Sequence, residues 1–204
     1  MENAFTLQDI QAAIVAVSFE YDVADLHEVE HYFNGFLVKW GGHTVLIAAK
    51  ALRESAAACG KHGTLLASAR QPSGERTEVE IDLKLPDVAS ASCATRNLIA
   101  FNVTEMLADH RDIVPMQLPW PPSLVSGREL RVLSLGTVCD TFADAHELSR
   151  PLQYDAGLPV IRRVDGADDK FAVVGIATGS GNVAALEEID QLIEQAARAS
   201  KLSI

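Results

Sequence analysis

FNGFLVKW at residues 33–40 and HTVLIAAKAL at residues 43–52 are two apolar runs separated by Gly41 and Gly42. Runs of this length, rich in β-branched and apolar residues and bounded by glycine, are typical of β-strands separated by a turn. Similar runs occur at residues 12–22, 63–71, 77–85, 97–103, 129–136, 158–164 and 170–179. Many short strands at close spacing favour a barrel or a sandwich over alternating βαβ units.

The last part of the chain has a helical pattern instead. Five apolar residues fall on one face at helical spacing: Leu186, Ile189, Leu192, Ile193 and Ala196. Glu187 and Glu188 stand in the first turn and Arg198 near the end, which matches the helix macrodipole. The sequence therefore predicts one α-helix over about residues 184–199.

The charge balance argues against nucleic acid as a partner. The 204 residues include 17 basic and 28 acidic side chains, so the formal net charge is −11, and the chain contains no basic block. Binding to a phosphate backbone depends on such basic clusters. Hydrophobic residues make up 48% and charged residues 22%, which is ordinary for a folded globular protein.

Membrane insertion, secretion and cofactor binding are not predicted either. No apolar run approaches the roughly 20 residues that cross a bilayer. The start, MENAFTLQDI, has no apolar signal-peptide region. Cys59, Cys93 and Cys139 show neither a disulfide framework nor CxxC spacing. We therefore expect a cytoplasmic protein with no cofactor and no membrane partner.

HEVEH at residues 27–31 is a literal H-E-x-x-H motif. On a helix, two histidines four residues apart can bind zinc while the glutamate acts as general base. The stretch falls between two predicted strands, however, and Glu30 is charged where such sites usually carry an uncharged residue. His27 and His31 are therefore weak metal candidates, and we expect a solvated acidic loop that holds no metal.

Several segments of the first half resemble the trypsin-like serine proteases, most closely the HtrA/Deg branch without its PDZ domains. FNGFLV (33–38) is similar to the G-S-G-F-hydrophobic strand of that family. GHTVLIAAKAL (42–52) resembles the segment G-x-x-h-T-A-A-H-h-h, in which h is hydrophobic and the histidine is catalytic. RNLIAFNV (96–103) resembles the strand D-h-A-h-h-x-V, which supplies the catalytic aspartate. The resemblance extends from about Ala12 to Ile193.

The second half continues the resemblance in the same order. SGRELRVLSLG (126–136) is similar to V-G-x-x-V-x-A-I-G, and YDAGLPV (154–160) stands where G-D/N-S-G-G-P-h is expected. FAVVGI (171–176) resembles the V-h-G-I strand. NVAALEEI (182–189) resembles N-h-A-h-P-h-x-x-h, which enters the terminal helix.

The resemblance implies an all-β fold in a single domain, residues 1–204. Two six-stranded antiparallel β-barrels would face each other across a cleft, with a C-terminal α-helix. The parts would be a first lobe at about residues 10–108, a connector at 109–127, a second lobe at 128–183 and the helix at 184–199. The apolar face of the helix is then expected to pack on the second barrel.

The same resemblance places Lys50 at the catalytic histidine, Asn97 at the aspartate and Ala156 at the serine. Triad chemistry needs a hydroxyl nucleophile, an imidazole that takes its proton and a carboxylate that orients the imidazole. None of the three residues supplies its group. Tyr154 and Asp155 form a degenerate oxyanion region, because Tyr154 stands where a glycine gives the backbone its freedom. No catalytic residue is therefore expected.

Lys50 leaves alternatives open. It could act as a base for a relocated nucleophile such as Ser134 or Ser149, or it could simply pair with Asp155. Cys139 could in principle be a nucleophile, although no histidine is placed to activate it. A noncanonical serine hydrolase, or a zinc enzyme that uses His27 and His31, is thus the alternative to a non-catalytic chain.

The cleft of a trypsin-like fold binds an extended peptide by adding it as a strand. The resemblance places the candidate peptide-binding wall at five residues: Gly175, Ile176, Ala177, Thr178 and Gly179. The sequence therefore predicts a pseudoprotease that acts as a binding or scaffold module for a protein or peptide partner.

Overall fold

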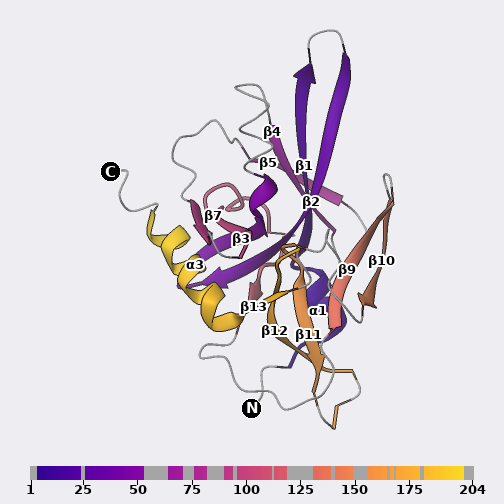
Figure 1. The fold of residues 1–204 in the computed structure, drawn as a ribbon, viewed down its shortest axis with the longest axis vertical. Coiled ribbons are helices and arrows are strands. Elements are labelled where there is room, and N and C mark those ends of the chain that lie inside the picture. Colours follow the sequence, from indigo (N-terminus) through magenta and orange to yellow (C-terminus); the bar gives the residue numbers. More distant parts are fainter. Residues whose placement is uncertain are drawn as a thin grey trace.

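Two β-sheets and a C-terminal helix make up the structure, a computed structural model (Figure 1). It describes residues 4–118 with gaps at 24–25, 53–63, 71–75, 82–89, 94–95 and 112. It also describes residues 131–199 with gaps at 139–140, 149–155, 165, 168 and 180–181. In the described part of the chain, no helix is long and apolar enough to span a membrane.

The first sheet has eight strands in the order β5-β4-β1-β2-β3-β7-β6, with β8 beside β2. Every pair in it is antiparallel except β2 with β8. Its strands are β1 (Ile14–Val23), β2 (Leu26–Trp40), β3 (His43–Ala49), β4 (Thr64–Arg70), β5 (Arg76–Ile81), β6 (Ser90–Cys93), β7 (Leu98–Asn102) and β8 (Met116–Gln117).

The second sheet has five antiparallel strands in the order β10-β9-β11-β12-β13. They are β9 (Arg131–Val138), β10 (Thr141–Leu148), β11 (Pro159–Arg163), β12 (Phe171–Ala177) and β13 (Val183–Ala185). The two labelled helices are α1 (Leu7–Gln11) and α3 (Leu186–Ala199).

The barrel prediction is confirmed only in its coarser form. The described residues are mostly β-strand in largely antiparallel sheets, with a helix at the C-terminal end, but the sheets have eight and five strands rather than six and six. Within these residues each sheet has two end strands, and no pair joins β5 to β6 or β10 to β13. The count differs partly because short β6, β8 and β13 give no strand signal in the sequence, and β8 lies in the predicted connector.

The turn between β2 and β3 follows from its two glycines. Gly41 and Gly42 have φ angles of +53° and +90°, and the register pairs Trp40 with His43 across them. A two-residue hairpin whose twist matches its strands needs positive φ at both positions, which glycine adopts without steric cost. The hairpin fixes the register of β3, the strand that leads to Lys50.

The central strands of the first sheet are buried on both faces. Val45 and Ile47 of β3 belong to one buried cluster, while Leu46 and Ala48 belong to another. The first cluster also contains residues of the second sheet and α3, such as Val160 and Ile189. The apolar run in β3 is therefore continuous because the strand lies between two hydrophobic layers.

Helix α3 packs on the first sheet more than on the second, so the expected packing on the second barrel is wrong. Its contacts are chiefly with β6, β7 and β3, with smaller contacts to β12 and β13. Figure 1 shows the helix beside β3 and β7. The indole Nε1 of Trp40 in β2 donates to Asp190 Oδ1 at 3.1 Å. The helix leaves the second sheet directly from β13 and thereby ties the two sheets together.

Candidate functional site

Lys50 and Asn97 lie next to each other because the strands that carry them are paired. The register of β3 with β7 sets Ala49 opposite Leu98, so the end of one strand meets the start of the other. The Lys50 N–H donates to the Asn97 carbonyl oxygen at 2.9 Å. Asn97 is exposed, and its φ of +53° lies in the left-handed region that asparagine tolerates.

Ala156 is buried and begins the turn that packs the second sheet against the first. At the next residue, Gly157, an added Cβ would lie 2.6 Å from the Asn34 carbonyl oxygen and 3.1 Å from the Ala48 Cα. Gly157 also has a φ of +94°, and its N–H donates to the Ala177 carbonyl at 3.0 Å. Only glycine allows this close approach between backbones.

The three positions that resemble a triad thus lie on elements that meet at the junction of the two sheets. Ala48 of β3, against which Gly157 packs, stands two residues before Lys50, and Lys50 follows directly after the end of that strand. The groups there are an amine on Lys50, a neutral amide on Asn97 and a methyl on Ala156. A methyl group has no nucleophilic atom, and an amide is no anionic acceptor for a base. Tyr154 and Asp155 lie outside the described residues.

The candidate peptide-binding wall lies along β12 and the turn after it. Gly175 and Ile176 have β11 on one side and β13 on the other. Ala177 pairs with Val183 of β13, and its N–H donates to the Leu158 carbonyl at 2.9 Å. A peptide strand could be added along these residues only by displacing a neighbour.

The end of this wall has a different geometry. Both the N–H and the hydroxyl of the buried Thr178 donate to the Asn182 carbonyl, at 3.0 and 3.1 Å. Gly179 follows with a φ of +77°, so the chain leaves the extended conformation there. Thr178 and Gly179 are therefore the part of the wall that does not lie between two strands.

The histidines of the H-E-x-x-H motif lie in β2, so the expected loop is wrong. The register sets His31 opposite Phe19 and Glu30 opposite Glu20 in β1. Four residues along a strand span about 13 Å, so the helical spacing that brings two such histidines onto one turn does not apply here. Among the described residues, no group of three His, Cys, Asp or Glu could hold a metal ion.

Ser134 lies in β9, while Ser149 and Cys139 lie outside the described residues.

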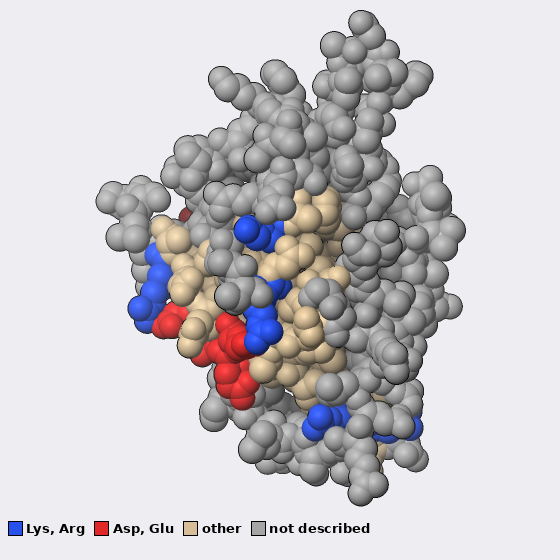
Figure 2. All heavy atoms as spheres, viewed as in Figure 1, with Lys and Arg blue, Asp and Glu red and all other residues tan. Residues whose placement is uncertain are grey.

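An ion pair that the sequence does not reveal stands beside Asn97. Arg96 donates from Nε to Glu188 Oε1 at 3.2 Å and from Nη2 at 2.5 Å. The other oxygen of Glu188 accepts the Ala185 N–H at 3.1 Å, as in one half of a capping box. Figure 2 shows basic and acidic side chains next to each other in the region where Figure 1 draws α3. The pair links the turn before β7 to the first turn of α3.

The hydrogen bonds from Arg96, with that from Ala185, hold the pKa of Glu188 below its usual 4.5. A lowered folded-state pKa adds stability above the unfolded pKa, and this stability is lost as pH falls through the folded value. We expect Glu188→Gln, which keeps an acceptor for Ala185, to lower the Tm by about 1–3 °C at pH 7. Thermal melts should show this difference shrink as the pH falls below 4.5 and disappear once the pH is below the lowered pKa.

Glu194→Gln is the matched control. Glu194 also pairs with an arginine, Arg198, but both residues lie in α3, so this variant removes a paired carboxylate without breaking the link between α3 and the turn before β7. A Glu188 difference that persisted unchanged at pH 3 would contradict the role of this charge.

The opposite end of β3 and β7 carries a polar network that the sequence also conceals. The Thr44 N–H donates to Thr104 Oγ1 at 2.8 Å, and this hydroxyl donates to Asn102 Oδ1 at 2.6 Å. Asn102 Nδ2 then lies 3.4 Å from His43 Nδ1. The network fixes the chain where it leaves β7, away from Lys50.

The two largely antiparallel sheets and the C-terminal helix form a fold similar to that of trypsin-like serine proteases. The structure is similar to the crystal structure of Deg5, with a TM-score of 0.55 and 14% identity over 90% of this chain and 88% of that chain. At this identity the likeness supports the fold and nothing more.

Two further solved structures match at lower TM-scores. They are GrC, at 0.44 and 12% identity over 93% of this chain and 96% of that chain, and tobacco vein mottling virus protease, at 0.41 and 15% over 90% and 80%. No protein-family model and no curated protein matches the sequence.

Proposed function

We propose that this chain is a non-catalytic homologue of the trypsin-like serine proteases that binds a protein or peptide without cutting it. The observation that carries the proposal is the residue Ala156 in a buried turn whose Gly157 packs on β3, the strand that leads to the hydrogen-bonded pair Lys50 and Asn97. The scaffold around these positions is kept while each residue lacks the group that peptide hydrolysis needs.

The chemistry supports loss of hydrolysis over a shifted mechanism. Acyl transfer needs a nucleophile, a base within hydrogen-bond reach and donors for the oxyanion in one arrangement. Replacing the nucleophile alone removes the covalent step, and here the base and its orienting group differ as well. The zinc alternative loses its support because His27 and His31 lie on a strand.

The extended peptide would bind at the end of the wall. Gly175–Ala177 are flanked by strands and the Thr178 N–H is bonded to the Asn182 carbonyl, so Gly179 is the point of the wall where a peptide backbone would join the sheet. Backbone pairing of this kind gives affinity that depends little on side chains. The formal charge of −11 argues against nucleic acid, and we propose a cytoplasmic protein or peptide partner.

A binding test compares two charge reversals. The purified chain is mixed with a diverse peptide library, and bound peptides are identified by mass spectrometry. In this proposal the peptide extends from the end of the wall to the triad positions, so Lys50→Glu should lower the affinity of the selected peptides at least about tenfold, because it puts a carboxylate where the amine faces the partly negative peptide carbonyls. Lys39→Glu, on an exposed residue of β2, makes the same change in net charge and should leave affinity unchanged. Equal losses in both variants would contradict a site at Lys50.

Restoring the triad residues should restore little activity. We expect Lys50→His/Asn97→Asp/Ala156→Ser to show at most about tenfold more peptide turnover than a buffer control, because a missing oxyanion donor alone lowers the rate about 10²–10³-fold relative to an intact site. The single variant Ala156→Ser is the control, and peptide turnover is the measurement. A gain of a thousandfold or more in the triple variant would show that the oxyanion region is intact.

A further inference from the structure

The N-terminal residues 4–13, here called the N-terminal strap, contact both sheets. Phe5 pairs with Phe171 of β12 through two hydrogen bonds, N–H to carbonyl in each direction, both 2.8 Å. At its other end, the Ala13 carbonyl accepts the Leu37 N–H of β2 at 2.8 Å. Ile10, between them, is fully buried in the cluster shared by the two sheets.

The strap is held in shape by one capping box. The Thr6 N–H and hydroxyl both donate to Asp9 Oδ2, at 2.9 and 2.7 Å, and the Asp9 N–H donates to Thr6 Oγ1 at 3.2 Å. The hydrogen bonds from the Thr6 hydroxyl and backbone lower the pKa of Asp9, with a smaller effect of Lys170. A five-residue helix is too short to be stable alone, so its formation depends on the cap and on docking.

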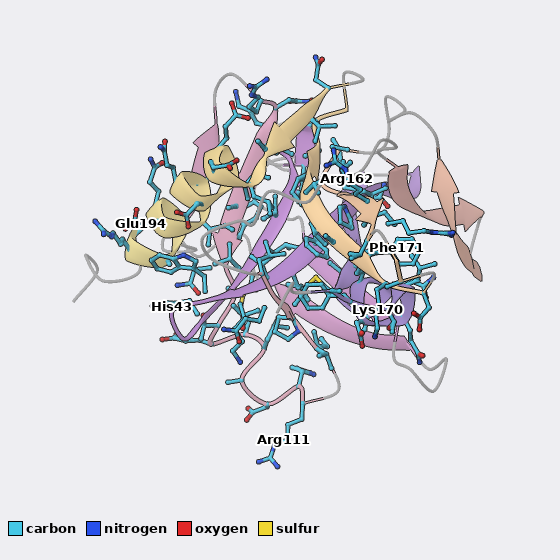
Figure 3. The ribbon with its side chains drawn as sticks, turned by 90° about the horizontal axis from the view of Figure 1, so that it is seen from below. His43, Arg111, Arg162, Lys170, Phe171 and Glu194 are labelled. Atoms are coloured by element: carbon cyan, nitrogen blue, oxygen red, sulfur yellow. The ribbon has the colours of Figure 1, made fainter. Side chains whose placement is uncertain are left out.

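The strand that the strap holds is the one that supports the candidate site. Phe171 begins β12, and Ala177, which accepts the Gly157 N–H, ends it. Figure 3 shows Lys170 and Phe171 side by side at one end of the second sheet. The guanidinium carbon of Arg163 in β11 lies over the Phe171 ring, 5.6 Å from its centroid. The end of β12 that is bonded to the strap is therefore also covered by a side chain of β11.

We propose that the N-terminal strap is a conformational latch: docked, it holds β12 and the Ala156–Gly157 turn against the first sheet, and released, it loosens that turn. One docked segment bonded to both sheets restricts their relative movement. Undocking removes the Phe5–Phe171 bonds and the Ile10 contacts in one step, because a short helix frays as a unit. The latch does not depend on whether the site binds peptide.

The test is amide hydrogen exchange in the full-length chain, measured by NMR. Thr6→Ala removes the hydroxyl of the capping box and should speed exchange at Phe5 and Phe171 about fivefold, since an N-cap loss is worth about that factor. The latch predicts a similar increase at Gly157, and no change at Val103, whose N–H bonds Thr44 within the first sheet.

Two controls share the same helix. Thr6→Ser keeps the hydroxyl and should restore slow exchange, and Gln8→Ala changes an exposed residue with no capping role and should have no effect. Faster exchange at Phe5 and Phe171 with Gly157 unchanged would overturn the proposal, because the strap would then fray alone. So would equal acceleration at Val103, which signals global destabilisation, or no change at any of these amides.

Discussion

Gly157→Ala is expected to lower the free energy of unfolding by about 3 kcal/mol. Two causes add. The φ of +94° costs a residue with a Cβ about 1–2 kcal/mol, and the methyl must enter space 2.6 Å from the Asn34 carbonyl oxygen. The obstructing atoms, the Asn34 carbonyl oxygen and the Ala48 Cα, belong to the backbones of β2 and β3, so they cannot rotate away as a side chain could. Relief requires the two sheets to separate at the candidate site.

Gly166→Ala is the matched control for this prediction. Gly166 has a φ of +81°, but no heavy atom lies within 4 Å of an added Cβ. Gly166→Ala should lower the free energy of unfolding only by the cost of the positive φ, about 1–2 kcal/mol. Urea denaturation of both variants gives the difference. Equal losses would mean that the turn at Gly157 does not press against the first sheet.

Phe36→Ala should cost about 3–5 kcal/mol, because Phe36 is fully buried and truncation leaves a large cavity. Phe36 belongs to the cluster that includes residues of both sheets and α3. The comparison is Phe101→Ala in β7, which removes the same side chain from the other cluster, inside the first sheet. Urea denaturation should show similar global losses for both.

The two variants should differ at the junction. We expect Phe36→Ala to speed amide exchange at Gly157 more than Phe101→Ala does, because only Phe36 lies in the layer between the sheets. Faster exchange at Gly157 in Phe101→Ala than in Phe36→Ala would contradict the assignment of the two layers.

Much of the secondary structure could be predicted from the sequence. The run HTVLIAAKAL (43–52) predicts a strand, and β3 occupies its residues up to Ala49. The helix predicted over 184–199 begins at Leu186. These elements have strong periodicity or unbroken apolar runs. Strand β6, with the sequence SASC, has no such pattern, and β8 has two residues, so their pairing depends on tertiary contacts alone.

The length of β2 was underestimated for a physical reason. The apolar run begins at Phe33, but the strand begins at Leu26, because the eleven-residue run before it, 12–22, needs an antiparallel partner of similar length. The acidic residues of HEVEH concealed that partner. A search for apolar runs does not find a strand segment of this composition.

The candidate site could be predicted position by position but not assembled. Motif resemblance identified Lys50, Asn97 and Ala156 separately. Their proximity depends on the β3–β7 register and on Gly157, and the link between Arg96 and Glu188 joins residues 92 positions apart. The occupied edges of β12 were equally hidden, since β13 is three residues long.

Cleavage of a diverse peptide library by the purified chain, read by mass spectrometry with and without a metal chelator, tests the central claim most directly. We expect no cleavage above a buffer control in either arm, because Ala156, Lys50 and Asn97 provide no nucleophile, base or anionic partner in the required arrangement. Reproducible cleavage would contradict the account. Chelator sensitivity would then indicate a metal site, and insensitivity a nucleophile placed elsewhere in the chain.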